Sequence, residues 1–239
     1  SMQVVGSSTA SDGRAYSIRA ECTGARFGYA SSVTITNIGL GGVKLRNAAG
    51  TGGGIFTGAY SATDNWQANL GSVVISTAGP VELHHLVTGC TTNGGTGTPA
   101  SVGNGTVTAG GDIMIAGDIS MHNYWSTAIR GTLTLTTTNS SSTITVGGLR
   151  LDRLLVAKFS APGNSRITGL LTGTDGNPAS GLGNIGTSLR VPSGQVIRYL
   201  PAQNPALNGA SYTLANMEGT GGAGGQLKPV SRGTVVTFQ

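Results

Sequence analysis

The segment GTLTLTTTNSSSTITVGG, residues 131–148, alternates aliphatic residues with threonine and contains no charged side chain. Leu133 and Leu135 share one parity and the threonines between them share the other, which is the two-residue period of a strand with one buried face. Threonine is β-branched and suits a pleated surface, so it can face water without weakening the strand. After the polar Asn-Ser turn the alternation resumes, with Ile144 and Val146 facing inward. The segment therefore predicts two short strands and a turn.

Comparable alternating segments recur along the chain, separated by Gly, Asn, Ser and Thr. They include SVTITNI at 32–38, SVVIS at 72–76, DIMIAGDISM at 112–121 and SRITGLL at 165–171. Short strands joined by such residues are typical of sandwiches, barrels and solenoids. The one candidate helix is 149–159, where leucines fall at helical spacing. The same leucines also alternate with polar residues, so we expect strands there.

The spacing of the strand clusters favours a solenoid. Successive clusters begin near residues 72, 106, 132 and 166, which gives a period of about 25 to 35 residues, the length of one β-helix turn with a variable loop. The prediction is an all-β parallel β-helix that forms a single domain over residues 1–239, with an N-terminal cap at 1–30 and a C-terminal cap at 200–239. A β-sandwich is the alternative.

Composition narrows the function classes. The net charge is +5, yet only 10% of residues are charged and the basic residues are scattered, whereas nucleic-acid binders gather them on one face together with aromatics. We therefore expect no nucleic-acid partner and no cofactor. No stretch approaches the ~20 apolar residues of a membrane-spanning helix. Cys22 and Cys90 could form one disulfide or remain two buried thiols.

A family resemblance adds to this pattern. TVTAGGDIMIAGDISM at 106–121, followed by the opening segment, resembles the rungs of bacterial secreted β-helices, namely haemagglutinin-like exoproteins and autotransporter passengers. Residues 194–229 are more loosely similar to exported repetitive surface proteins. The resemblance covers roughly residues 30–200 and has no diagnostic motif. It implies a right-handed parallel β-helix exported to the cell surface or the extracellular space, and it assigns no functional residue.

Parallel β-helices also serve as glycoside hydrolases and polysaccharide lyases, so the carboxylates need attention. Hydrolysis of a glycosidic bond needs two carboxyl groups ~5 to 9.5 Å apart. Asp112 and Asp118 share parity, and a corner at Ala116-Gly117 would place both at equivalent positions of the coil. The alternative is that these aspartates accept hydrogen bonds from backbone amides at turns.

The segment LRLDR offers a lyase-like set. Arg150 or Arg153 could act as a base beside an arginine-neutralised uronate, with Asp152 next to them. Arg150 and Asp152 lie two residues apart and would point to the same face. The simpler interpretation is a surface ion pair, which is common and contributes little stability.

The histidines and aromatics complete the candidates. Glu82 and His84 would share one face of a strand beside His85, and His122 from the next rung could add a third metal ligand. We favour ordinary histidines and no metal site.

Tyr124 and Trp125, in MHNYWSTA, and Trp66 could stack on sugar rings or contact a partner. Alternatively, they pack back on the solenoid.

These observations favour a non-enzymatic bacterial surface or extracellular module, structural or adhesive, that displays loops or associates with itself. A carbohydrate-active β-helix, lyase or hydrolase, is the competing hypothesis, with a host or extracellular glycan as substrate. A glycan-binding module without catalysis is the third.

Overall fold

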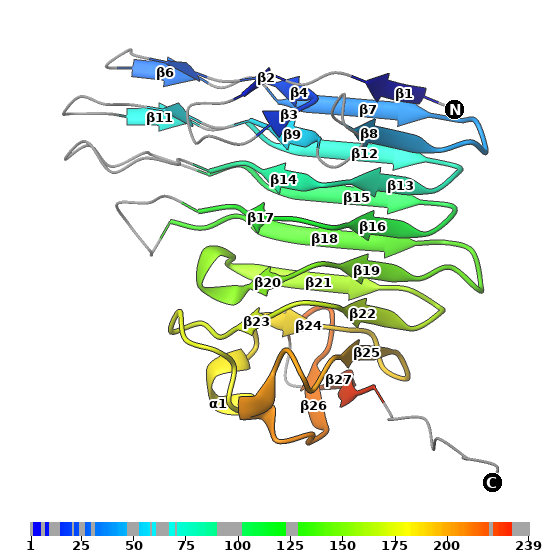
Figure 1. The fold of residues 1–239 in the computed structure, drawn as a ribbon, viewed down its shortest axis with the longest axis vertical. Helices are drawn as coiled ribbons and strands as arrows, with labels where there is room; N and C mark the ends of the chain where they lie inside the picture. The colour runs from blue at the N-terminus through cyan, green and yellow to red at the C-terminus, as the bar shows by residue number, and fades with distance from the viewer. Residues whose placement is uncertain are drawn as a thin grey trace, which may run out of the picture.

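The computed structural model describes residues 2–5, 8–9, 15–20, 22–23, 27–29, 32–46, 53–57, 59–60, 67–69, 71–89, 102–122, 129–219 and 222–230. Its strands stack along the long axis, with the N-terminal strands at one end and the C-terminal strands at the other (Figure 1). The protein is all-β, and its main element is a large, mostly parallel sheet of 15 strands.

One half of this sheet is a column of strands that we call the first column. Its members pair in parallel in the order β7 (Val33–Asn37), β12 (Val73–Thr77), β15 (Gly105–Ala109), β18 (Thr132–Thr137), β21 (Val156–Ser160) and β24 (Leu189–Arg190). We call the chain between one member and the next a coil. The shortest coil runs from residue 133 to residue 157 and the longest from 33 to 73, so the expected period of 25 to 35 residues holds approximately.

The other half is the second column, again of parallel strands. They are β1 (Met2–Val5), β8 (Val43–Arg46), β13 (Val81–Leu83), β16 (Ile113–Ile115), β19 (Ile144–Val146), β22 (Ser165–Ile167) and β25 (Val196–Tyr199). Each coil therefore contributes one strand to each column. This parallel pairing differs from the antiparallel pairing of the β-sandwich alternative.

Shorter strands form a third side of the stack. β4 (Ile18–Arg19), β9 (Gly54–Phe56), β14 (His85–Val87) and β17 (Ile119–Ser120) pair in parallel, and β20 (Leu149–Arg150) pairs with β23 (Leu171–Thr172). Further pairs are parallel β5 (Cys22–Thr23) with β10 (Ala59–Tyr60), parallel β6 (Phe27–Tyr29) with β11 (Gln67–Asn69), and antiparallel β2 (Ser8–Thr9) with β3 (Ala15–Tyr16). Helical structure in the described residues is limited to α1 (Leu182–Ile185) and 3₁₀ turns at Leu151–Arg153 and Pro205–Leu207.

The core lies between the columns and consists of aliphatic side chains in register. One register position on four successive strands is occupied by Ile75, Val107, Leu135 and Phe159, which are all fully buried. The alternation predicted for 131–148 is confirmed: Leu133, Leu135, Ile144 and Val146 are buried, whereas Thr132, Thr134 and Thr136 are partly exposed on the other face. Burying one such side chain contributes roughly 1.5–3 kcal/mol.

Residues 149–160 contain strands, as expected, but a turn divides them. β20 ends at Arg150, the 3₁₀ turn Leu151–Arg153 follows, and β21 begins at Val156. Leu151 and Leu154 are fully buried, because the turn directs both of them into the core. The leucine spacing that suggested a helix is thus the spacing of this turn.

The C-terminal end of the sheet is closed by a hairpin. β26 (Tyr212–Ala215) and β27 (Ala223–Pro229) pair antiparallel, and they also pair in parallel with β24 and β25, the last strands of the two columns. The hairpin therefore links the columns and lies within the expected C-terminal cap. The expected cap at 1–30 contains β1 and β4, which pair in parallel with the next coil. The division of the chain into a solenoid and two caps stays a prediction.

The same side-chain hydrogen bond occurs in two successive coils at the third side. The buried hydroxyl of Thr57 donates to the carbonyl of Gly71 at 2.6 Å, and Thr88 donates to Gly103 in the same way one coil later. In the next coil Met121 takes the threonine's place, and its carbonyl accepts from the backbone N–H of Gly131 at 2.7 Å. The pairs Thr57–Gly71, Thr88–Gly103 and Met121–Gly131 are therefore joined at the same corner in successive coils.

Candidate functional site

The turns between the second column and the third side form a surface cavity of about 360 Å³. Three successive coils contribute to it, through residues 116–119, 147–150 and 169–172. Glycines let the coils approach closely here, because a Cβ on Gly147 or Gly169 would overlap a backbone carbonyl of the coil before it. Asp118 and Arg150, two residues that the sequence marked as candidates, both line this cavity.

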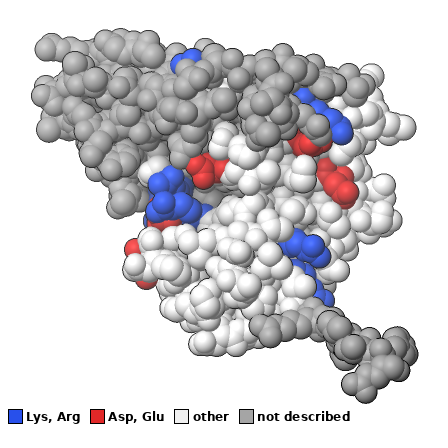
Figure 2. All heavy atoms as spheres, viewed as in Figure 1, with Lys and Arg blue, Asp and Glu red and all other residues white. Residues whose placement is uncertain are grey.

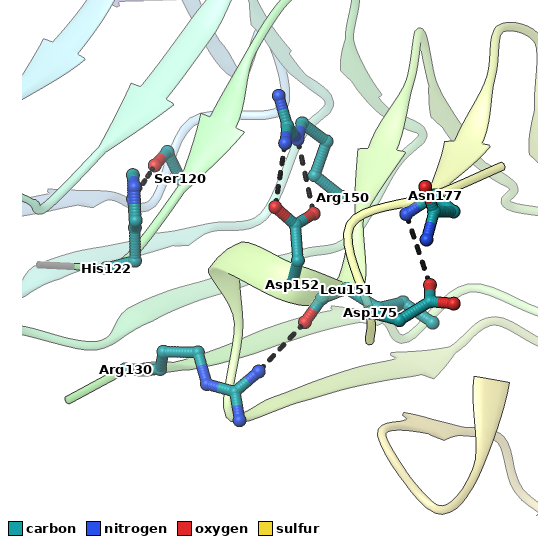
Figure 3. A network of polar contacts seen from close by, with 8 residues as sticks. All are labelled: Ser120, His122, Arg130, Arg150, Leu151, Asp152, Asp175 and Asn177. Carbon is teal, nitrogen blue, oxygen red and sulfur yellow. Dashed lines mark hydrogen bonds and ion pairs between the residues drawn. The ribbon is translucent and has the colours of Figure 1, made fainter. Parts of the chain in front are cut away.

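Arg150 and Asp152 form a bidentate ion pair beside the cavity (Figure 3). The Nη2 group of Arg150 donates to Oδ2 of Asp152 at 2.7 Å, and its Nε donates to Oδ1 at 3.2 Å. The Asp152 side chain is 19% exposed and that of Arg150 is 43% exposed. The surface ion pair expected from LRLDR is therefore present, and it already engages both oxygens of the carboxylate.

Two further arginines lie at this corner. Arg130 donates from a terminal nitrogen to the carbonyl of Leu151 at 3.5 Å, and its buried Nε is the one buried side-chain polar atom of the described residues that lacks a hydrogen-bond partner. The carbonyl of Arg153 accepts from the N–H of Met121, which holds the 3₁₀ turn against the coil before it. Arg130 therefore lies close to the 3₁₀ turn that carries Asp152 and Arg153.

His122 lies at the edge of the same corner. Its Nδ1 is 2.7 Å from the hydroxyl of Ser120, and it precedes the segment that leads to Arg130 (Figure 3). Burial, and after it the nearby positive charge of Arg153, lowers the pKa of His122 from 6.5 to about 4. The imidazole is therefore neutral at physiological pH and can act as a hydrogen-bond donor or acceptor, but not as a cation.

Asp112 belongs to a different corner, which corrects the expected equivalence with Asp118. The chain does turn at 116–118, but Asp112 precedes β16 and lies level with Pro80, whereas Asp118 precedes β17 and lies level with His85. Asp112 accepts hydrogen bonds from the backbone N–H of Thr143 at 2.7 Å and from its hydroxyl at 3.1 Å. Asp112 therefore has the turn-stabilising role that was the alternative.

The residues that were considered as an alternative set of metal ligands contact several different partners. Glu82 forms an ion pair with Lys44 on the neighbouring strand, the rings of His84 and His85 contact each other edge-on, and His122 contacts Ser120. His85 accepts a hydrogen bond from the N–H of Asp118 at 3.1 Å through its Nδ1. Within the part of the chain that the structure describes, no three His, Cys, Asp or Glu residues form a group that could hold a metal ion.

Several candidates lie outside the described residues: Trp66, Tyr124, Trp125 and Cys90. Cys22 belongs to β5, and its side chain is not among those described. A sugar-stacking role for these aromatics stays a prediction.

Sequence reasoning missed Arg130 and the glycine-lined cavity. Arg130 is isolated in the sequence, and it reaches LRLDR only because Gly131 and Leu155 are joined by a hydrogen bond between adjacent coils. An alignment of the coils by their strand starts would have brought the two segments together.

No described helix is long and apolar enough to cross a membrane.

The corner brings the guanidinium group of Arg150 and the carboxylate of Asp118 to one cavity, so it can form charge-assisted hydrogen bonds with a polar ligand. It lacks a pair of carboxylates that are both free, because Asp152 is engaged by Arg150. Comparisons with protein-family models, with curated proteins and with solved structures returned no match.

Proposed function

We propose that this chain is a right-handed parallel β-helix of the bacterial cell surface or extracellular space, and that it serves as a non-enzymatic structural or adhesive module. The in-register parallel pairing of both columns supports this architecture. A solenoid of this kind presents a long, regular side surface, and its stability comes from contacts between neighbouring coils.

The observation that carries the proposal is a continuous column of hydroxyl side chains on the outer face. Five successive strands of the first column place a threonine or serine at the same outward position: Thr36, Ser76, Thr108, Thr136 and Ser160. Neighbouring strands lie about 4.8 Å apart, so these hydroxyls form a neutral polar stripe along the stack. Such a stripe suits contact with a neighbouring surface or a glycan, and it supplies no group that would do chemistry.

Four of the six carboxylates in the described residues support the same conclusion. Glu82 is paired with Lys44, Asp112 with Thr143, and Asp152 with Arg150. Asp175 accepts a hydrogen bond from the backbone N–H of Asn177, which lowers its pKa. A glycosidase needs one carboxyl group that holds a proton and a second that is free to act as base or nucleophile. These carboxylates instead stabilise turns and strand pairs.

The two ends of the stack differ in a way that bears on assembly. At the C-terminal end the hairpin β26–β27 pairs with both columns, whereas β1 and β7 are the terminal strands of the sheet at the other end. A terminal strand presents backbone groups that can pair with another chain. End-to-end self-association through this edge is therefore part of the proposal.

The cavity at Asp118 and Arg150 favours one competing function, a carbohydrate-active β-helix. A guanidinium beside an acidic residue in a groove could hold a uronate, with Arg153 and Asp152 close by. That function requires bond cleavage, which distinguishes it from the adhesive role.

The test is a panel of neutral and acidic polysaccharides, with two readouts on the purified chain: retention, and release of reducing ends or unsaturated products. The proposal predicts retention or self-association without any released product. Product release that depends on Arg150 or Asp118 would replace it with the carbohydrate-active alternative. Sedimentation at increasing concentration tests the assembly step, and a strict monomer at high concentration would contradict it.

A further inference from the structure

Three cations lie at one outward position on successive strands of the second column and its closing strand. Arg166 of β22 is level with Arg198 of β25, and Arg198 is level with Lys228 of β27. Strands at this spacing place their side chains about 4.8 Å apart. We call these residues the cationic column. Figure 2 shows basic atoms at the lower right of this face, apart from the acidic atoms above them.

No described carboxylate forms an ion pair with the cationic column. Arg198 donates to the backbone carbonyl of Pro229 at 3.3 Å, which orients the side chain but does not neutralise it. Near the N-terminal end, the charge at the same outward position is neutralised, because Lys44 is level with Glu82 and the two form an ion pair. Like charges at adjacent positions destabilise a sheet, so the cationic column is a place where an anionic ligand would relieve repulsion.

A surface cavity of about 650 Å³ lies against this column. Its lining is rich in hydroxyl, amide and guanidinium groups, and includes Thr143, Thr145, Asn164, Ser165, Arg166 and Arg198. The side chains of Thr145 and Asn164 make no hydrogen bond to another described residue, so they are free to bind a ligand. Thr145 is level with Arg166, which extends the polar column by one strand toward the N-terminal end.

The shape and chemistry of this surface match a linear polymer. Successive cations are separated by a distance comparable to the length of one sugar residue, and guanidinium groups bind carboxylates and sulfates through paired hydrogen bonds. The hydroxyl and amide groups can bind sugar hydroxyls. Nucleic-acid surfaces combine basic residues with aromatic side chains on which bases stack, and none of the described residues that line this cavity is aromatic.

We propose that the cationic column binds a linear acidic polysaccharide that carries a carboxylate or sulfate on its successive sugars. The polymer runs along the stack, across the strands, with its anionic groups on Arg166, Arg198 and Lys228 and its hydroxyls on Thr145 and Asn164. This inference rests on the proposed adhesive role and gives that role a ligand class.

The experiment measures binding of the purified chain to four immobilised probes: polygalacturonate, heparin, neutral dextran and a single-stranded DNA oligonucleotide. Binding to polygalacturonate or heparin, and not to dextran, is expected at about 0.15 M salt, where the Debye length of about 8 Å leaves close contacts effective. The two acidic polymers distinguish carboxylate from sulfate recognition. Preferred binding to the oligonucleotide would overturn the proposal.

The test variant is the double substitution R166Q/R198Q, and its matched control is K158Q/R190Q. Lys158 and Arg190 are also level with each other, but on the first column, so the control removes the same net charge from a different face. The test variant should weaken binding about tenfold or more, because charge-assisted hydrogen bonds are lost. The control should stay within about twofold, as expected for distant surface charges at this salt. Equal losses in both variants would show that only net charge matters.

Thermal unfolding without ligand checks that the variants fold. R166Q/R198Q should melt at the same temperature as the parent or higher, since it removes repulsion between adjacent positions. A lower melting temperature would contradict the conclusion that the cations of the column repel one another without an acidic partner. This proposal and the proposed function can fail separately. Cleavage of a retained polymer would contradict only the non-enzymatic role. Absence of retention on both acidic probes would contradict only the ligand proposed for the cationic column.

Discussion

Lys44 and Glu82 face each other across neighbouring strands of the second column, with Nζ of the lysine 3.2 Å from Oε2 of the glutamate. Three coils further along, the same outward position is occupied by Arg166, the first residue of the cationic column, which has no acidic partner among the described residues. The register of the stacked parallel strands thus decides whether an outward charge lies beside an opposite charge or beside a like charge on the neighbouring strand.

The Lys44–Glu82 pair should contribute little to stability. Both side chains are partly exposed, 42% for the lysine and 22% for the glutamate, so solvent and salt screen the attraction. Glu82→Gln is expected to lower the free energy of unfolding by less than about 1 kcal/mol, measured by urea denaturation. The difference should shrink in high salt. A larger, salt-independent loss would mean that Glu82 has a further structural contact.

Inward and outward residues of β18 should respond very differently to truncation. Leu135 is fully buried between its register neighbours, so Leu135→Ala should cost about 2–5 kcal/mol through lost burial and a cavity. Thr134 lies on the outer face, and Thr134→Ala should change stability by no more than about 0.5 kcal/mol. Urea denaturation of both variants tests the alternation, and equal effects would contradict the two-faced strand.

Gly42 should be intolerant of a side chain. It has a φ of 73°, in the left-handed region, and a Cβ there would overlap the backbone of Pro80 in the adjacent coil. Gly42→Ala should therefore destabilise the protein by at least about 2 kcal/mol, or prevent folding. The matched control is Gly183→Ala in α1, where a Cβ meets nothing and alanine is the better helix former. Similar effects of the two substitutions would contradict the close approach at Gly42.

His122 should make stability depend on pH. Its pKa is about 4 in the folded protein and near 6.5 when unfolded, so between these values the unfolded chain binds a proton that the folded chain does not. The free energy of unfolding should therefore be highest above about pH 6.5 and fall toward pH 4, by up to about 3 kcal/mol.

His122→Gln removes the titrating group, so it should flatten that part of the pH profile. His84→Gln is the control, because it leaves the Ser120–His122 contact and Arg153 in place. If the His122→Gln variant keeps the full dependence between pH 4 and 6.5, another group is responsible.

Much of the fold follows from sequence because its signal is local. The alternation around Leu133 and Ile144 reports which face is buried, and the spacing of strand clusters reports the length of a coil. The division of 149–160 was not predictable in the same way. Leu151 and Leu154 fit both a helix and a strand pair, and only the packing of the 3₁₀ turn against the preceding coil selects the observed structure.

The site was predictable only where its members are neighbours in sequence. Arg150 and Asp152 are two residues apart, and their ion pair is the one predicted. Asp118 joins Arg150 through the register of separate coils, and Arg166, Arg198 and Lys228 become level for the same reason. Their alignment depends on unequal coil lengths, which a single sequence without a strict repeat does not reveal.

The most direct test of the non-enzymatic role is a product-release time course on every polysaccharide that the chain retains. Wild type and the variants Arg150→Ala and Asp118→Asn are incubated with each polymer, and reducing ends and unsaturated products are recorded together. The scaffold role predicts retention with no product above the level of a heat-denatured control. Steady product formation by the wild-type chain that both variants abolish would show instead that the cavity at Asp118 and Arg150 is an active site.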